Sequence, residues 1–323
     1  MNEPFDPASK KLLAGHPQDR LLGAQVIAAF GRQYRVRLAN GNEMTCLTRG
    51  KKSEVACGDI VQVRRTDSPA TQPGTDFSAD YESDAQGVIE SIVPRRSLLH
   101  RSDAYREKII AANATQIIVV VAAEPSFNDE LLARCLVAAY DQQLEVLIVL
   151  NKCDLLDAAA VARGRMVSYS TIGYRVLELS AKQNVSTLRP FLTNHCSVLV
   201  GQSGMGKSTL INALLPDAHA ATREISSALD SGKHTTTHAR LYRVDKSSNL
   251  IDCPGVQAFG LHHLSFGGIE QGFVEFAQYL GQCRFRDCHH VHEPGCALRE
   301  AVAAGKIDAR RLSLFQQIAA NKA

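Results

Sequence analysis

The sequence predicts a multidomain α/β protein, with a small N-terminal β-barrel, a mostly parallel sheet covered by helices, and a helical C-terminal region. Three observations predict it. Short alternating segments fill residues 21–94, apolar and helical segments alternate over 95–262, and Cys and His residues cluster within 263–323. The 323 residues are enough for two or three hydrophobic cores. We therefore expect three domains with these limits, preceded by a flexible tail over residues 1–20.

Residues 21–94 carry five short segments of strand character and no long helical pattern. The segments are 24–30, 34–38, 43–47, 60–63 and 87–93. Asn40-Gly41, between the second and the third, favours a two-residue hairpin turn. Five short strands in one small region are typical of a closed barrel of the OB type. Residues 66–86 hold five acids and no base, so we expect a loop there.

Basic residues concentrate in the predicted barrel, although the whole chain has a net charge of only +3. Nine Lys and Arg residues lie between positions 20 and 65, against three acids. Such a local excess suggests a polyanionic partner, and we expect an RNA-binding barrel.

The sequence shows neither a secretory signal nor a membrane span. Its first ten residues are polar, and its longest apolar run, residues 117–123, is too short to cross a bilayer. Nine cysteines without a secretory signal favour reduced thiols. We therefore expect a soluble, cytoplasmic protein.

After residue 94, strand and helix patterns alternate. Apolar strand patterns cover 116–121, 144–150, 176–179, 197–200, 239–244 and 249–251, and helix patterns cover 129–140 and 207–214. This spacing is typical of a mostly parallel sheet covered by helices. Such sheets bind ligands at the C-terminal ends of their strands, so motifs that directly follow strands are candidates for the site.

A complete phosphate-binding loop follows the strand 197–200 and begins a helix. Its backbone N–H groups and the positive end of the helix dipole would surround the phosphates. Lys207 would reach the β- and γ-phosphates, and Ser208 would ligate Mg²⁺. The nucleotide-binding residues expected here are Gly201, Gln202, Ser203, Gly204, Met205, Gly206, Lys207, Ser208 and Thr209.

Two further motifs, each directly after a predicted strand, would determine which nucleotide base is bound. The Asp154 carboxylate, after the strand 144–150, can accept hydrogen bonds from guanine N1–H and its 2-amino group, whereas adenine offers only a lone pair at N1. A backbone N–H of the second motif would contact guanine O6. Alone, the first is also explained as a helix cap and the second is weak; together at one sheet edge they support each other. The expected residues are Asn151, Lys152, Cys153, Asp154, Ser180, Ala181 and Lys182.

Asp252-Cys-Pro-Gly255 resembles the Asp-x-x-Gly element of GTPases. Asp252 would hold Mg²⁺ through water, and the Gly255 N–H would contact the γ-phosphate. Residues 232–237 lie where the first switch belongs, and one of their threonines would complete the magnesium shell. We favour Thr236, with Thr235 and Thr237 as alternatives.

Valine occupies position 256, where Ras-type enzymes place a glutamine that orients water. Because Val256 cannot hydrogen-bond water, we expect a low intrinsic rate unless another group serves. His234, beside the threonines, is the catalytic candidate, and a surface or packing histidine is the alternative.

The order of the motifs indicates a circular permutation. The two base motifs precede the phosphate loop, the switch threonines and Asp252, whereas an ordinary GTPase runs with the last three first. Permutation costs little where the original termini lie close together at the surface. As a consequence, the second switch leads directly into the C-terminal region.

That region contains a cluster of metal-ligand residues. Three thiolates, from Cys283, Cys288 and Cys296, and one imidazole would form a closed, tetrahedral zinc site. His289, His290 and His292 compete for the fourth position, and buried free cysteines beside solvated histidines are the alternative. We expect this region to have a core separate from that of the phosphate loop.

Together these motifs resemble the circularly permuted GTPases of bacterial small-ribosomal-subunit biogenesis, the RsgA (YjeQ) family. The resemblance extends from about Leu21 and rests on the permuted order, on Gly-x-His-Thr-Thr at 232–236 and on Cys-x4-Cys-x-His-x5-Cys. It implies zinc ligation by Cys283, Cys288, His290 and Cys296. It also implies an N-terminal OB-type barrel, a circularly permuted P-loop GTPase domain and a C-terminal helical zinc-binding domain.

The resemblance further implies GTP as substrate with Mg²⁺, and one structural Zn²⁺. The implied partner is the immature small ribosomal subunit with its rRNA, and the implied role is its late maturation. We expect a monomer whose turnover the subunit stimulates. Two alternatives remain at this point: a GTP-gated switch that binds a non-ribosomal RNA, and a non-enzymatic scaffold that binds nucleotide structurally.

Overall fold

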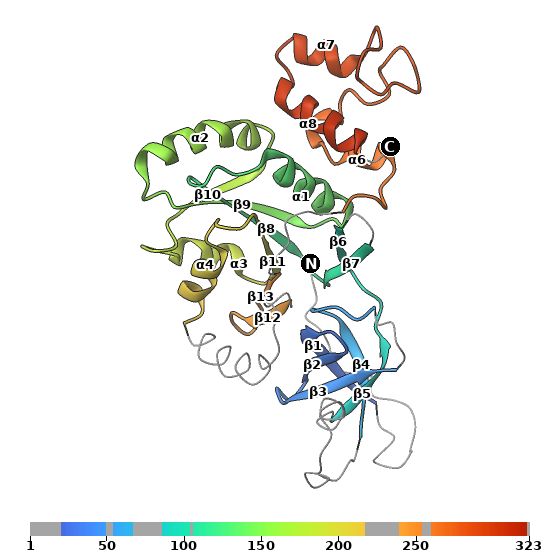
Figure 1. The fold of residues 1–323 in the computed structure, drawn as a ribbon, viewed down its shortest axis with the longest axis vertical. Coiled ribbons are helices and arrows are strands. Elements are labelled where there is room, and N and C mark those ends of the chain that lie inside the picture. Colours follow the sequence, from blue (N-terminus) through green and yellow to red (C-terminus); the bar gives the residue numbers. More distant parts are fainter. Residues whose placement is uncertain are drawn as a thin grey trace.

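The computed structural model describes residues 21–49, 54–66, 86–103, 106–216, 239–253 and 260–321. A barrel, a sheet flanked by helices and a group of short C-terminal helices follow one another along the long axis (Figure 1). The predicted tail over 1–20 and the predicted acidic loop lie outside the described residues, apart from the ends of that loop. The limits of the three domains stay a prediction.

The predicted five-stranded barrel is confirmed. Its strands are β1 (Leu22–Phe30), β2 (Gln33–Leu38), β3 (Glu43–Thr48), β4 (Ile60–Arg65) and β5 (Gly87–Ile92). They pair in the order β1-β2-β3-β5-β4, and a further β1–β4 pairing closes the barrel. Alternate side chains such as Val26, Val36 and Val61 are fully buried in its own apolar core. The alternation of apolar and polar residues in the sequence therefore places every second side chain of these strands in the barrel interior.

The mostly parallel sheet is also confirmed. Parallel pairing joins β10 (Arg175–Glu178), β9 (Glu145–Asn151), β8 (Gln116–Ala122), β11 (Cys196–Val200) and β13 (Asn249–Asp252), in that order. β12 (Arg240–Arg243) is antiparallel to β13. The helical elements of this part are α1 (Asp129–Asp141), α2 (Leu156–Thr171), η2 (Ser186–Leu188), α3 (Arg189–Leu192) and α4 (Lys207–Leu214).

The prediction missed several elements of this region. They are the whole of α2, the short η2 and α3, and a separate two-stranded hairpin of β6 (Leu98–Asp103) and β7 (Arg106–Ala112). The buried residues of α2 include Ala159 and Ala162, whereas Leu156 and Val161 are more than two-thirds exposed. Because these aliphatic side chains face outward and two of the four buried residues are alanine, α2 lacks the usual hydrophobic contrast of an amphipathic helix.

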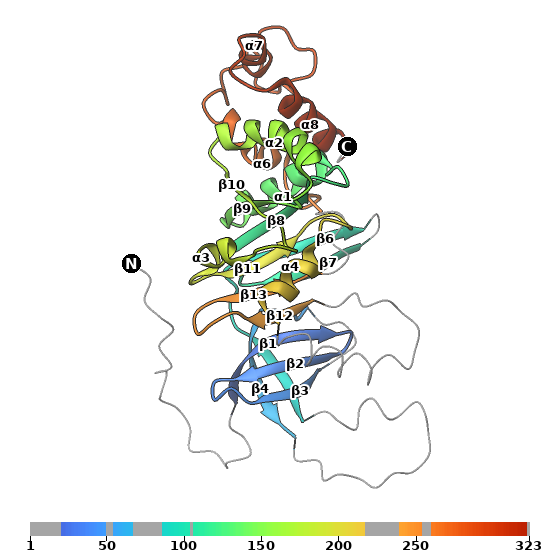
Figure 2. The ribbon, with the colours of Figure 1, turned by 90° about the vertical axis from the view of Figure 1, so that its left-hand side faces the viewer.

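The barrel is joined to the larger sheet by strand pairing, and an ion pair with a buried carboxylate fixes the segment that leaves the barrel. β1 pairs with β12 at Ala28 and Arg240, so the sheet continues from one part into the other (Figure 2). Next to this junction the Arg95 guanidinium donates to both oxygens of the fully buried Asp59, at 2.7 and 2.8 Å. The strand pairing therefore connects the two parts, and the ion pair fixes the direction in which the chain leaves the barrel.

Gly58 allows the two parts to approach closely. It has a φ of +94°, and an added Cβ would lie 2.2 Å from the carbonyl oxygen of Ala112 in β7. The Gly58 carbonyl accepts a hydrogen bond from Asn113 Nδ2 at 3.1 Å. A side chain at position 58 would therefore be strained and would collide with backbone.

The C-terminal region packs against the helices of the sheet. Its elements are α6 (Phe266–Gln271), η3 (Val274–Phe276), α7 (Ala297–Ala303) and α8 (Ala309–Ala320). Phe273, Phe276 and Phe315 are fully buried in one apolar cluster with α1 and the sheet. An added Cβ at Gly272 would lie 2.8 Å from Val137 of α1. The expectation of a separate C-terminal core is therefore wrong, because aromatic side chains from this region complete the core that covers the sheet.

Two expectations from the sequence concern the state of the cysteine thiols and the presence of a membrane span. All nine cysteines lie in the described part, and none is in a disulfide. Among the helices that the structure describes, none combines the length and the apolar character that a bilayer span requires.

Candidate active site and metal centre

One cavity brings the predicted motifs together at the C-terminal ends of β9, β10, β11 and β13. Its volume is about 630 Å³. Both base motifs, the phosphate loop and Asp252 contribute to its walls. The lining residues are Asn151, Lys152, Asp154, Leu155, Ser180, Ala181, Lys182, Gly201, Ser203, Gly204, Gly206, Lys207, Ser208, Thr209 and Asp252.

Three of the predicted nucleotide-binding residues are turned away from this cavity or buried beneath it. Met205 is fully buried, and the Cys153 thiol lies 3.2 Å from the carbonyl oxygen of Leu150. The Gln202 side chain accepts a hydrogen bond from the Asn128 N–H at 3.1 Å. Leu155, which was not predicted, lines the cavity directly after Asp154 and carries no polar signal that the sequence would have shown.

Asn151 connects the two base motifs with the phosphate loop. Its amide is buried, and Nδ2 donates to the carbonyl oxygen of Met205 in the phosphate loop at 2.8 Å. Its Oδ1 accepts from the N–H groups of Lys152 at 2.8 Å and Ala181 at 2.9 Å. One side chain thus fixes the base-reading loops relative to the phosphate loop. An added Cβ at Gly206 would lie 2.4 Å from Asn151 Nδ2, so this contact requires glycine there.

Asp154 and Ser180 offer unpaired polar atoms to a ligand. Asp154 Oδ1 and Ser180 Oγ are both buried and have no aligned hydrogen-bond partner among the described residues. The nearby Ser180 hydroxyl lowers the pKa of Asp154, and Lys182 and Lys152 contribute less, so the carboxylate is charged near neutral pH. A buried oxygen without a partner is costly unless a ligand supplies the donor. A guanine N1–H and amino group would supply it.

The phosphate loop has the backbone that its glycines were expected to allow. Gly201 has a φ of +146°, and an added Cβ would lie 2.2 Å from the carbonyl oxygen of Val120. Gly206 is left-handed at +88° and directly precedes α4. Lys207 Nζ donates to the carbonyl oxygens of Gly201 and Gln202, which folds its ammonium group back over the loop. The loop is therefore shaped to present N–H groups and one cation to phosphate oxygens.

Lys207 and Asp252 both line the cavity and are close enough for their charges to interact. Burial lowers the pKa of Lys207, and the Asp252 charge opposes that shift. Burial likewise raises the pKa of Asp252, against the effect of Lys207. The half-buried Asp252 carboxylate and the Ser208 hydroxyl are oxygen ligands of the kind that Mg²⁺ binds, so the residues present fit this ion.

The remaining predicted residues of the site lie outside the described part of the chain. They are His234, Thr235, Thr236, Thr237, Gly255 and Val256. Their roles stay predictions from the sequence.

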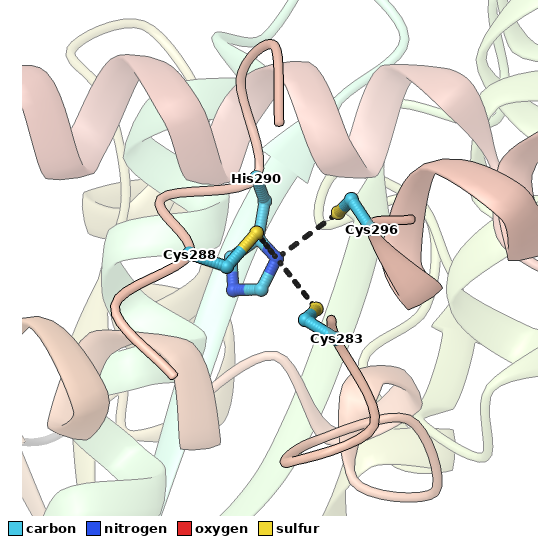
Figure 3. Close-up of side chains that lie close together, drawn as sticks. All are labelled: Cys283, Cys288, His290 and Cys296. Carbon is cyan, nitrogen blue, oxygen red and sulfur yellow. Dashed lines mark hydrogen bonds between the residues drawn. The ribbon is translucent and has the colours of Figure 1, made fainter. Parts of the chain in front are cut away.

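A second site lies in the C-terminal region, where three thiols surround one imidazole nitrogen (Figure 3). His290 Nδ1 is 3.6 Å from Cys283 Sγ, 3.5 Å from Cys288 Sγ and 3.3 Å from Cys296 Sγ. All four atoms lie within 4.8 Å of one another. A tetrahedral zinc ion with bonds of about 2.0–2.3 Å needs ligand atoms at such separations. The structure thus brings His290 to the thiols, and the residues fit zinc.

Glu270 orients the imidazole, and the sequence analysis missed it. Its Oε1 lies 2.6 Å from His290 Nε2, and Glu270 is on α6, ahead of the cysteine cluster. A carboxylate on the second nitrogen fixes the ring and the tautomer that leaves Nδ1 available to a metal. His289, one of the alternatives for the fourth position, has a side chain that is 68% exposed and points to Glu293.

We expect the purified protein to carry about one zinc ion per chain and Cys288→Ala to lose it. Because the C-terminal aromatic residues share the core of the sheet, the same variant should lower the melting temperature of the whole chain. Nucleotide affinity below that temperature should survive, since no zinc ligand lines the cavity. Elemental analysis and calorimetry measure these effects. Cys135→Ala, which removes a buried thiol from α1, is the control and should retain zinc; undamaged protein without zinc would contradict the site.

Comparison with known proteins gives one family. The model of the RsgA GTPase family matches residues 92–262. A relative from Nitrosospira multiformis, the small ribosomal subunit biogenesis GTPase RsgA, is 51% identical over 300 residues, which are 93% of this chain and 91% of the relative. The protein of the same name from Nitrosomonas europaea is 48% identical over 301 residues, 92% of this chain and 90% of the relative.

Solved structures agree with these relatives. The crystal structure of YjeQ from Thermotoga maritima has a TM-score of 0.67 and 26% identity, and the match covers 94% of this chain and 99% of that one. YloQ, described as a circularly permuted GTPase, has a TM-score of 0.65 at 23% identity, with 96% and 98% covered. This second likeness shows the fold alone.

Proposed function

Because this chain belongs to the RsgA GTPase family, and is therefore a GTP hydrolase, we propose that it binds the small ribosomal subunit and assists its late maturation. The observation that carries the proposal is the combination of a relative 51% identical over nearly the full chain with a cavity that unites all the described guanine and phosphate motifs. The subunit, its rRNA and GTP are the proposed partners. The proposed setting is a cytoplasmic monomer.

Within the cavity, we propose that Asp154 and Ser180 bind the guanine base. The charged carboxylate, whose Oδ1 has no aligned partner among the described residues, would accept from guanine N1–H and the 2-amino group. The Ala181 N–H, which already donates to Asn151, fixes the second base motif. An adenine would leave the carboxylate unpaired, so GTP is favoured over ATP.

At the other end, N–H groups of residues 201–209 and the Lys207 ammonium would hold the β- and γ-phosphates. Ser208, Thr236 and Asp252 would hold Mg²⁺, which supplies charge neutralisation to the phosphates when bound. Gly255 would contact the γ-phosphate through its N–H. His234 is the proposed catalytic residue, which would orient the attacking water that Val256 cannot orient.

The barrel supports the proposed contact with rRNA, although part of its positive charge is paired within the chain. Glu43 forms ion pairs with Arg35 and Arg37 on β2, and Glu90 with Arg49 and Arg64. These pairs lie at the surface and are at least partly exposed, and surface ion pairs are weak, so phosphates can compete for their arginines. Arg32 and Arg65 are also exposed. We propose that these side chains bind the RNA backbone and that the zinc-binding region makes a second contact.

Co-sedimentation with purified small subunits, in the presence of a non-hydrolysable GTP analogue, tests the proposal. Binding should be strong at low salt and should weaken steeply as salt rises, because phosphate contacts release counterions. The alternative, a switch that acts on a non-ribosomal RNA, predicts equal or stronger binding to free transfer or messenger RNA. Binding to those RNAs without binding to subunits would reject the proposed function.

A further inference from the structure

The loop between β8 and α1, residues 124–128, contacts the phosphate loop but belongs to none of the nucleotide motifs. The Asn128 N–H donates to Gln202 Oε1 at 3.1 Å. Pro125 lies beside Gly204, where an added Cβ would be 3.4 Å from the proline Cγ. The segment that would bind the phosphates is therefore supported from outside itself at two neighbouring positions.

Arg165 of α2 holds this loop with an unusually complete set of contacts. Its guanidinium donates to Ser126 Oγ at 2.6 Å and to the carbonyl oxygen of Phe127 at 2.8 Å. It forms an ion pair with Asp129 at 3.0 Å and lies 3.7 Å from the centre of the Phe127 ring. The planar fork of arginine can satisfy a hydroxyl, a carbonyl, a carboxylate and an aromatic face together, which lysine cannot.

The C-terminal region reaches the same cluster from its other side. Arg310 of α8 donates to Ser168 Oγ at 3.1 Å and to the carbonyl oxygen of Arg165 at 3.4 Å. It also lies 3.7 Å from Asp129. Figures 1 and 2 show α8 beside α1, of which Asp129 is the first residue. Polar contacts therefore run from α8 through Arg165 and residues 124–128 to Gln202.

We propose that Arg165 is a positioning residue for the phosphate loop. It fixes residues 124–128, these residues hold the loop through Gln202 and Gly204, and Arg310 supports the arrangement from α8. The inference rests on the proposed role of residues 201–209 in binding phosphates. Backbone N–H groups must point at the phosphate oxygens, so a loop released from this support loses affinity for the phosphates rather than for the base.

The test is Arg165→Ala in the full chain. Its affinity for GDP and for GTP should fall about fivefold or more, the equivalent of one lost hydrogen bond. The ³¹P resonance of the bound GDP β-phosphate should also shift, which a general loss of stability would not produce. Arg165→Lys should keep the charge beside Asp129 but not both bonds to residues 126 and 127, and should give an intermediate loss. Arg163→Ala, on the same helix in an exposed pair with Glu178, is the matched control and should bind normally.

A double-mutant cycle gives the sharper result. Gln202→Ala removes the other end of the support, so the variant with both substitutions should lose less affinity than the product of the two single losses. Losses that multiply, or an unshifted β-phosphate resonance with only a lower melting temperature, would overturn the proposal. If Arg165→Ala does not fold, Arg310→Ala should show the same shift with a smaller loss of affinity, and no shift there would also overturn it. A wild-type chain that does not bind GDP would instead reject the phosphate loop itself.

Discussion

Purified small ribosomal subunits are expected to raise the rate of GTP hydrolysis by this chain by roughly 10²–10⁴, the effect of fixing one catalytic group in place. The free enzyme should be slow because Val256 cannot orient water and because His234 would need to be held near the γ-phosphate. The permuted order joins the second switch to the C-terminal region through a short segment. Docking of that region would therefore order the switches. Phosphate release measured at saturating GTP, with and without subunits, gives the ratio.

His234→Ala should lose most of the stimulated rate while its affinity for GTP stays close to normal. His262→Ala, which removes an exposed histidine, is the control and should be stimulated fully. Equal turnover with and without subunits would reject the coupling between docking and hydrolysis. Full stimulation of the His234→Ala enzyme would reject only the catalytic role of this histidine.

Replacement of Asp154 by Asn is expected to weaken GTP binding by roughly 30- to 1,000-fold and to create binding of xanthosine nucleotides. The asparagine amide places a donor where guanine also offers donors, whereas xanthine has a carbonyl in place of the 2-amino group. The substitution changes the carboxylate whose Oδ1 has no aligned partner among the residues that the structure describes. Equilibrium titration with GTP, ATP and XTP measures the change in preference.

Asp157→Asn is the matched control, because this exposed carboxylate lies in the first turn of α2, close in sequence to Asp154. It should leave nucleotide preference unchanged. If Asp154→Asn kept the wild-type preference for GTP over ATP, Asp154 would not be part of the base site.

The strands and motifs that share the cavity were predictable because each is specified locally. The segment 207–214 was predicted as a helix and is α4, since a glycine loop precedes it and marks where the helix begins. The motif after β9 was also visible in the sequence. The two hydrogen bonds by which Asn151 joins this motif to the other two were not, because they connect residues that are distant in sequence.

Features that depend on tertiary contacts escaped prediction for the same reason. Glu270 has no motif of its own, and only folding brings its carboxylate to His290. Arg165 lies on a helix that exposes Leu156 and Val161 and buries two alanines, so the element that carries it had no clear pattern. The shared core of the sheet and the C-terminal region arises from aromatic residues that equally suit a small separate core.

The pairing of β1 with β12 also affects how the GTPase can be studied without the barrel. Without residues 1–94, β12 would become an unprotected edge strand, and such an edge is a template for pairing with a second chain. A truncated chain should therefore self-associate in light scattering, so that loss of subunit stimulation would report association as well as lost docking. Substitution of the exposed Arg32 and Arg65 keeps that edge covered and separates the two effects.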